Sequence, residues 1–321
     1  MHEIAHINQN LPSSEFPTNY DELINAYLAD AQVRNNSKTR YKPALKLYFD
    51  WLTKKKYELK NITLTELLIY KKETGELVGS DGKLLSRMTV GFRVIAIKAF
   101  YNWCESKFLM PNPGKFLKSP PSENKFQKKP LSPEQCTRLL DYFKSTGSHR
   151  NFAIANLMLR CGLRTVEVIR ADCGDIEVRG ESRILWVHGK GRNSKDKWVE
   201  LRPKAYEPIA EYWKIRNDDA KTTPMFTSES VVGPGGRLIP GTISELIKVG
   251  LRAIGLNDPS ISAHSLRHST GTNMMRMGAT QKDVQNTLRH AKESTTEGYV
   301  ATLKDENRLK KSAESLLDDL F

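Results

Sequence analysis

Apolar residues recur at helical spacing through the first third of the chain. Between residues 38 and 54 the apolar residues fall on one side of a predicted helix and basic residues on the other, the pattern of a helix half-buried in a core. The stripe consists of Tyr41, Leu45, Tyr48, Phe49 and Leu52. A longer helix is predicted over 86–107, and Asn19 and Thr63, each followed three residues later by glutamate, predict two further helix starts. The pattern predicts a four-helix module over residues 19–113.

The pattern changes at residues 114–130, which are rich in proline, serine and lysine and show no periodicity. We interpret this segment as a basic linker between two domains. Ser132 then opens a new helix, with proline next and glutamine three residues after the serine. The predicted organisation is a flexible lead (1–18), the helical module, the linker and a second domain over 131–321.

The second domain mixes helices with a short β-segment. Residues 151–161 predict a helix that ends at Gly162, and Thr165 is the expected N-cap of the helix that follows. Two β-rich runs, Ile184–Val187 and Trp198–Leu201, flank a glycine-containing turn and predict a hairpin. The expected fold class is therefore mainly α with a small β-sheet.

The C-terminal segment, about 304–321, predicts an amphipathic helix. Its apolar stripe consists of Leu309, Ala313, Leu316, Leu317 and Leu320. Such a stripe has to be buried. We expect it to pack on its own domain or on a neighbouring protomer.

Charge points to a polyanionic partner. The chain has 321 residues and a formal net charge of +13. Residues 1–130 carry 21 Lys and Arg against 13 Asp and Glu, a net of +8, and the remainder has a net of +5. A basic balance in both parts favours nucleic acid touched by both. A basic protein without such a partner is the alternative.

Several protein classes are disfavoured by the sequence. No apolar run approaches the ~20 residues that span a bilayer, and the N-terminus lacks the basic-then-apolar pattern of a secretory signal. The four cysteines are far apart, without the spacing of a zinc site, which fits unpaired thiols in a reducing compartment. We expect a cytoplasmic, nucleoid-associated protein.

Two histidines four residues apart raise the question of a metal. His264 and His268 would lie on one helical face, but Arg267 stands between them and no carboxylate or cysteine completes a ligand set. We therefore expect no metal, and we interpret His268 as a residue that packs or contacts the backbone. An arginine beside an imidazole is better suited to an anion, because the guanidinium fork matches two phosphate oxygens.

Five separate segments of the second domain carry candidate site residues. Four of the segments supply arginine, lysine or histidine, which suit an anion, and the fifth supplies a tyrosine. In chain order they are Arg164 (in Gly-Leu-Arg-x-x-Glu), Lys190 (in Gly-Lys-Gly), His264 and Arg267 (in His-x-x-Arg), His290 and Tyr299. This order and spacing resembles the tyrosine recombinase (phage integrase) family, in its simple Xer-like two-domain form. The resemblance covers residue 130 to the end, and the helical module resembles the family's core-binding (SAM-like) domain.

The resemblance implies a reaction. Tyr299 would attack the scissile phosphate, form a 3′-phosphotyrosyl bond and release a 5′-hydroxyl. Arg164, Arg267 and His290 would stabilise the charge that builds on the phosphate. With fixed cations in the pocket and the energy of the cut kept in the covalent bond, no metal, ATP or other cofactor is expected.

Three further residues receive supporting roles. His264 would help accept the phenol proton, Lys190 would protonate the leaving oxygen, and Glu167 would orient an arginine or its helix. Two alternatives stay open. Tyr299 could be an ordinary packed tyrosine. A basic neighbour of Lys190 in the same turn (Arg192, Lys195 or Lys197) could be the acid.

One position departs from the family pattern. The residue before the second histidine is commonly glycine there, whereas this chain has Arg289. An added DNA contact or a reshaped pocket would follow. The full set of candidate DNA contacts is Lys38, Arg40, Lys42, Arg87, Arg93, Arg192 and Arg289.

The predicted function is site-specific cutting and rejoining of DNA, for integration or excision of a mobile element or for resolving replicon dimers. The expected partners are duplex DNA with a specific recombination site, further protomers in a homotetramer (or a related recombinase), and accessory proteins. Two alternatives remain: a type IB topoisomerase-like enzyme that relaxes DNA, and a DNA-binding regulator without catalysis.

Overall fold

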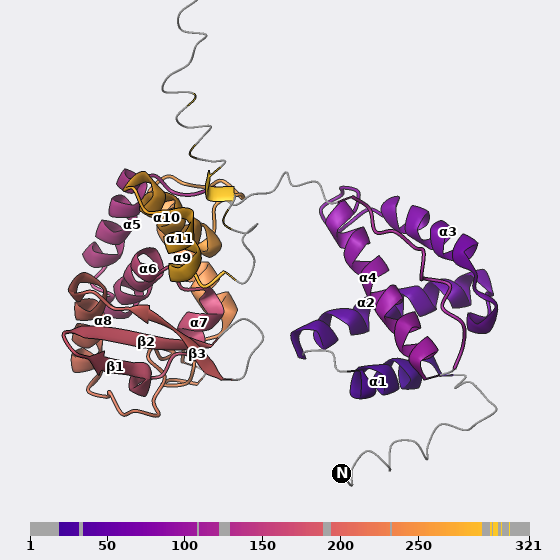
Figure 1. Cartoon of the computed structure of the whole chain (residues 1–321), viewed down its shortest axis with the longest axis horizontal. Helices are drawn as coiled ribbons and strands as arrows, with labels where there is room; N and C mark the ends of the chain where they lie inside the picture. The colour runs from indigo at the N-terminus through magenta and orange to yellow at the C-terminus, as the bar shows by residue number, and fades with distance from the viewer. Residues whose placement is uncertain are drawn as a thin grey trace, which may run out of the picture. The chain divides into compact units, whose positions relative to one another are not determined.

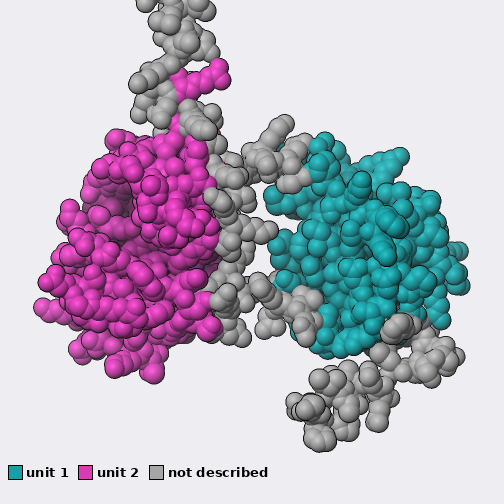
Figure 2. Space-filling view, in the orientation of Figure 1, with its two compact units in different colours: residues 1–124 teal, residues 125–321 magenta. Residues whose placement is uncertain are grey.

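The computed structural model describes residues 19–31, 35–107, 109–121, 129–188, 194–231, 233–290, 296, 298–300, 303 and 308. The chain forms two compact units, residues 1–124 and 125–321 (Figure 2). The predicted division into lead, core-binding domain, linker and catalytic domain is finer than this and stays a prediction. The predicted C-terminal helix lies largely outside the described residues.

The first unit is helical (Figure 1). Its α-helices are α1 (Tyr20–Asp30), α2 (Asn35–Lys55), α3 (Leu64–Gly75) and α4 (Arg87–Ser106), and a 3-10 turn spans Leu59–Asn61. Thr63 and Glu66 form the predicted capping box of α3, which is confirmed. The four helices predicted for this module are therefore all present.

Aromatic side chains fill the core of the first unit. The apolar stripe predicted for α2 is buried, apart from the partly buried Tyr41, and packs on α4. The hydroxyl groups of Tyr48 and Tyr101 hydrogen-bond each other at 2.7 Å inside this core. Phe49 and Phe100 pack edge to face, with 5.4 Å between ring centroids.

The second unit is built mainly from seven described helices (Figure 1). These are α5 (Pro133–Ser145), α6 (His149–Cys161), α7 (Thr165–Arg170), α8 (Pro203–Arg216), α9 (Pro240–Ala253), α10 (Ala263–Arg276) and α11 (Gln281–Thr287), with a 3-10 turn at Cys173–Asp175. The capping box predicted at Ser132 is confirmed. Helix α6 contacts α5, α8 and α10, so it lies at the centre of the unit.

A three-stranded antiparallel sheet completes the second unit. Its strands are β1 (Ile176–Arg179), β2 (Ser182–His188) and β3 (Lys195–Glu200), in the order β1-β2-β3. The hairpin of β2 and β3 is confirmed, with Trp186 opposite Trp198 and a register shift beside His188. Strand β1 was not predicted, because four mostly exposed residues give no clear alternating signal.

Within the described ranges, no helix is long and apolar enough to cross a membrane. The four cysteines are free thiols, and Cys104, Cys161 and Cys173 are buried. Among the residues with described positions, no group of histidine, cysteine and carboxylate side chains could hold a metal ion.

Candidate active site

The turn between α6 and α7 presents the first arginine. Gly162 ends α6 with φ 59°, the left-handed conformation that favours glycine. Arg164 itself is the N-cap of α7, whereas the sequence predicted Thr165 for this role. The physical reason is Glu167, whose carboxylate accepts a hydrogen bond from the Arg164 backbone N–H at 2.9 Å and ties down the helix start.

The second arginine enters from α10. Arg267 is 1% exposed and donates hydrogen bonds to the backbone carbonyl oxygens of Gly162, at 2.5 Å, and of Leu288. These partners lie 105 and 21 residues away in sequence. Arg267 thus joins the α6–α7 turn, α10 and the end of α11 at one point.

Glu167 is the hub of this cluster. Its carboxylate contacts the side chain of Arg164 at 2.5 Å and that of Arg289 at 2.7 Å, while Arg267 stands 3.7 Å away. Burial raises the pKa of the Glu167 carboxyl, but the three guanidinium groups outweigh burial and hold it below its usual value. Burial, Arg164 and Arg289 lower the pKa of Arg267 to about 9, so it stays cationic at neutral pH.

Arg289 has an unexpected position. Its side chain is 4% exposed, which differs from the exposed position that a DNA contact requires. Its backbone has φ 55°, the conformation for which the family's glycine is suited and which costs an arginine about 1 kcal/mol. The sequence showed the departure from glycine but not that the guanidinium turns inward.

Two of the predicted site residues meet as stacked rings. The rings of Tyr299 and His290 lie 5.9 Å apart and are nearly parallel, at 7°. Burial lowers the pKa of His290 to about 3, assisted by Arg267, Arg164 and Arg289, so the imidazole is neutral at pH 7. Its Nδ1 is hydrogen-bonded to the Thr296 hydroxyl at 3.0 Å.

Tyr299 itself is 2% exposed. Burial raises the pKa of its phenol, and Arg267 and Arg164 only partly oppose this effect. Gly271 on α10 makes room for the ring, because a Cβ at this position would lie 3.0 Å from Tyr299 Cζ. No sequence signal pointed to Gly271, which is an unremarkable glycine inside a helix.

The rings of His264, His268 and Tyr299 contact one another in series along α10. The His268 ring lies 4.8 Å from the Tyr299 ring and 5.7 Å from the His264 ring. Burial and the nearby His264 and Arg267 lower the pKa of His268 to about 4. The predicted packing role of His268 agrees with these contacts, although its packing against the candidate nucleophile was not foreseen.

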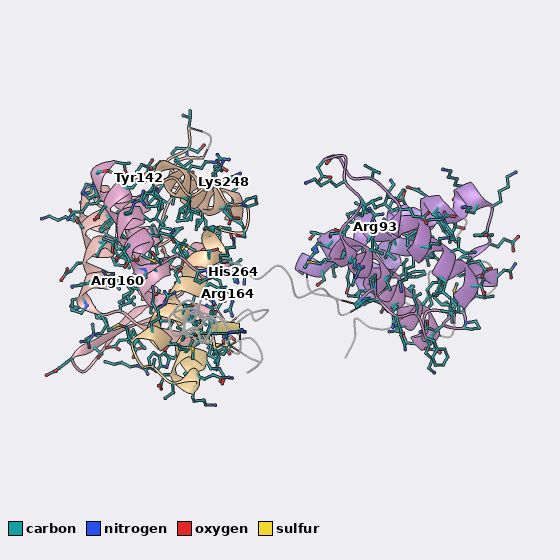
Figure 3. All side chains as sticks on the ribbon, turned by 90° about the horizontal axis from the view of Figure 1, so that it is seen from above. Arg93, Tyr142, Arg160, Arg164, Lys248 and His264 are labelled. Atoms are coloured by element: carbon teal, nitrogen blue, oxygen red, sulfur yellow. The ribbon has the colours of Figure 1, made fainter. Side chains whose placement is uncertain are left out.

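His264, labelled in Figure 3, is exposed at the start of α10. A cavity of 680 Å³ opens beside it. Thr165 at the start of α7 and the cations Lys248 and Arg252 of α9 also line this cavity. Lys248 and Arg252 are four residues apart, which places them on one face of α9, and this spacing was the signal in the sequence that could have identified them.

Lys190 and Arg192 lie outside the described residues. Of the alternatives to Lys190, Lys195 is bound by Asp175 at 2.5 Å and Asp172 at 2.9 Å. These carboxylates outweigh burial and raise the pKa of Lys195, which disfavours it as the acid. Lys197 is exposed on β3.

The candidate DNA contacts of the first unit lie on two helices that pack together. Lys38, Arg40 and Lys42 belong to α2, and Arg87 and Arg93 to α4 (Arg93 is labelled in Figure 3). Arg40 stacks over the Phe92 ring at 4.1 Å, and Lys42 donates a hydrogen bond to the Asn25 side chain at 3.0 Å. Their role stays a prediction.

The chain is similar to known recombinases in sequence. Tyrosine recombinase XerC of Caldanaerobacter subterraneus subsp. tengcongensis is 29% identical over 225 residues, which cover 68% of this chain and 60% of that protein. The aligned part therefore spans less than two thirds of that relative. Tyrosine recombinase XerD of Rickettsia bellii is 28% identical over 313 residues, 93% of this chain and 97% of that protein.

The fold has a close counterpart among solved structures. The XerH site-specific recombinase, bound to palindromic difH substrate in a post-cleavage complex, superposes with a TM-score of 0.71 at 19% identity, covering 87% of this chain and 80% of that one. The predicted mainly helical fold with a small sheet is confirmed. A sequence model of the phage integrase family matches residues 129–306. Because this match covers more than half of the sequence, the chain belongs to the phage integrase family.

Proposed function

We propose that this chain is a site-specific recombinase that cuts and rejoins duplex DNA through a 3′-phosphotyrosyl intermediate. The observation that carries the proposal is the convergence of Arg164, Arg267 and His290 on one buried tyrosine, Tyr299. These residues come from separate segments of the chain. The His290 ring stacks on the Tyr299 ring at 5.9 Å. Arg164 and Arg267 lie 2.5 Å and 3.7 Å from the same carboxylate, Glu167. Family membership supports the same chemistry.

In the proposed reaction the Tyr299 oxygen forms a bond to phosphorus while the bond from phosphorus to the 5′-oxygen breaks. His264 helps take the phenol proton, and Lys190 gives a proton to the leaving 5′-oxygen. Rejoining reverses these steps with a 5′-hydroxyl as the attacking group. The role of Lys190 is supported by sequence spacing alone.

The cationic cluster has the charge that this reaction needs. Three arginines surround one carboxylate, Glu167, which leaves an excess of positive charge for a phosphate. Donors that are already in place stabilise developing charge without reorganising, and one such donor contributes about 100- to 1,000-fold in rate. The neutral imidazole of His290 adds a hydrogen-bonding group. Because Tyr299 is 2% exposed, DNA binding has to open a path to it.

DNA binding would use both basic parts of the chain. Lysine and arginine contacts to phosphates supply affinity that falls as salt rises. The cavity lined by His264, Lys248 and Arg252 is a further candidate for backbone contact. A DNA substrate also implies the cytoplasm, at the nucleoid, as the place of action. Integration, excision and dimer resolution would all use this same pocket.

Recombination of two sites would involve four protomers, linked by cyclic exchange of the C-terminal segment. A chain truncated after about Lys304 is expected to bind a single DNA site but to be impaired in strand exchange. Unchanged recombination by the truncated chain would count against the exchange.

The deciding experiment traps the covalent intermediate. Footprinting on the flanks of the chain's own gene identifies a protected site, and a nicked suicide duplex of that site is then incubated with the protein. A covalent protein–DNA band is expected for the wild type and for the control Tyr142→Phe, which changes a partly buried tyrosine of α5 (labelled in Figure 3). The band is expected to vanish in Tyr299→Phe. DNA binding without any covalent band would instead support a non-catalytic regulator, and relaxation of a plasmid lacking the site would support the topoisomerase alternative.

A further inference from the structure

Arg289 combines a strained backbone with a buried charge. Lys56, Asn217 and Arg289 are the three non-glycine residues with positive φ in the described part of the chain, at 57°, 55° and 55°. Lys56 and Asn217 are exposed, whereas the Arg289 side chain is 4% exposed. A strained conformation that persists at a site is a reason to look for a function.

The Arg289 guanidinium is held by three contacts. It donates hydrogen bonds to the Thr287 carbonyl oxygen at 2.6 Å, to Glu167 Oε2 at 2.7 Å and, at 3.3 Å, to the Gly162 carbonyl oxygen. Gly162 and Glu167 lie 127 and 122 residues away in sequence. The side chain therefore ties the end of α11 to the turn that presents Arg164.

Arg289 and Arg267 compete for one carboxylate oxygen. Glu167 Oε1 is taken by the Arg164 side chain, and Oε2 already accepts from Arg289 and from the Arg164 backbone N–H. Arg267 is left 3.7 Å from Oε2 and is held instead by two neutral carbonyl oxygens. Carbonyl oxygens position the Arg267 guanidinium without neutralising its charge.

We propose that Arg289 is a positioning residue that occupies Glu167 and thereby keeps the Arg267 charge available for the scissile phosphate. The inference rests on the proposed function. With glycine at this position, Glu167 Oε2 would lose its closest guanidinium partner. Arg267 would then close the 3.7 Å gap and form a direct ion pair, turning part of its charge away from the phosphate.

The test compares Arg289→Gly and Arg289→Lys with the matched control Asn217→Gly, which relieves the same positive φ on an exposed residue far from the cluster in sequence. Covalent complex formation on the nicked duplex is measured in single turnovers at saturating DNA, and the Kd for the DNA is measured separately. For Arg289→Gly we expect a rate about 10- to 100-fold below wild type, because a donor is misplaced. We expect its Kd to change less than threefold, and Arg289→Lys to recover much of the lost rate.

A crystal structure of Arg289→Gly gives a readout that does not depend on activity. Movement of Arg267 into direct contact with Glu167 would support the inference, and an unchanged distance would overturn it. A wild-type rate in Arg289→Gly, or an equal loss in Asn217→Gly, would also overturn it. If the wild type itself formed no covalent complex, the proposed function would fail. In the outcomes that overturn only the role of Arg289, the wild type still forms the complex.

Discussion

The position of the Tyr299 ring can be tested by adding a single carbon on the neighbouring helix. In Gly271→Ala, the new Cβ would lie 2.9 Å from Leu288 Cδ1, 3.0 Å from Tyr299 Cζ and 3.1 Å from Tyr299 Cε1. Carbon atoms at their preferred separation are ~3.5–4.0 Å apart, so the ring has to retreat from α10 by roughly half an ångström.

The expected effect on stability is small. Overpacking a core costs about 1–3 kcal/mol, and alanine in place of glycine inside a helix returns about 1 kcal/mol. The free energy of unfolding should therefore fall by about 0–2 kcal/mol, and most of the protein stays folded. The cleavage rate is expected to fall about 10- to 100-fold, because displacement of a reacting group by less than 1 Å already disturbs the line of attack.

The assay is single-turnover formation of the covalent complex on the nicked duplex, with the folded fraction measured by urea unfolding. Gly250→Ala is a matched control in the same unit, since its Cβ would clash with Phe143 Cζ at 2.6 Å in the core and not with the site. The control should lose stability but keep its rate per folded molecule. If Gly271→Ala cleaved as fast as the wild type, the tyrosine would act from a place other than the pocket beside α10.

Three further outcomes are expected from buried polar groups. Glu167→Gln removes the only carboxylate that contacts the described arginines of the cluster. Breaking a buried ion pair in this way should lower the free energy of unfolding in urea by about 3–5 kcal/mol. A loss under about 1 kcal/mol would contradict the central role of Glu167 in the cluster. The pKa of His290 is about 3 in the fold and ~6.5 when unfolded. Between these two values the unfolded state binds more protons than the folded state. The free energy of unfolding is therefore unaffected by protonation of His290 above pH 6.5 and falls as the pH drops below it, by at most about 1.4 kcal/mol per pH unit. His290→Gln should therefore flatten the dependence of unfolding free energy on pH between 6.5 and 4, and an unchanged slope would show that the imidazole is not buried neutral. Tyr48→Phe leaves the Tyr101 hydroxyl unpaired in the core of the first unit and should cost about 1–3 kcal/mol without changing the cleavage rate of folded protein; a changed rate would mean that this core reaches the chemistry.

Local signals predicted most of the secondary structure. The capping boxes at Thr63 and Ser132 and the glycine end of α6 each depend on side-chain and backbone groups within about four residues. Apolar periodicity likewise identified the buried faces of the long helices. Such signals act within one short segment, so they can be recognised in the sequence alone.

The same local view was wrong at the start of α7. Thr165 is a good capping residue, yet Arg164 takes the N-cap position because Glu167 satisfies its backbone N–H. Strand β1 was missed because its pairing with β2, and not its own composition, makes it a strand. In both cases a partner residue, and not the type of the capping or strand residue itself, decided the conformation.

The sequence by itself determined which chemical groups the chain carries and how they are spaced, and this was enough to indicate the family and its candidate site residues. Only the tertiary structure decided how they are arranged: that Glu167 is surrounded by three arginines, that Arg289 turns inward, and that Gly271 makes room for Tyr299. The physical reason is distance along the chain. Contacts between residues 105 to 127 positions apart form only when the helices pack against one another. Packing therefore decides which charges lie beside one carboxylate and which side chain fills a given space.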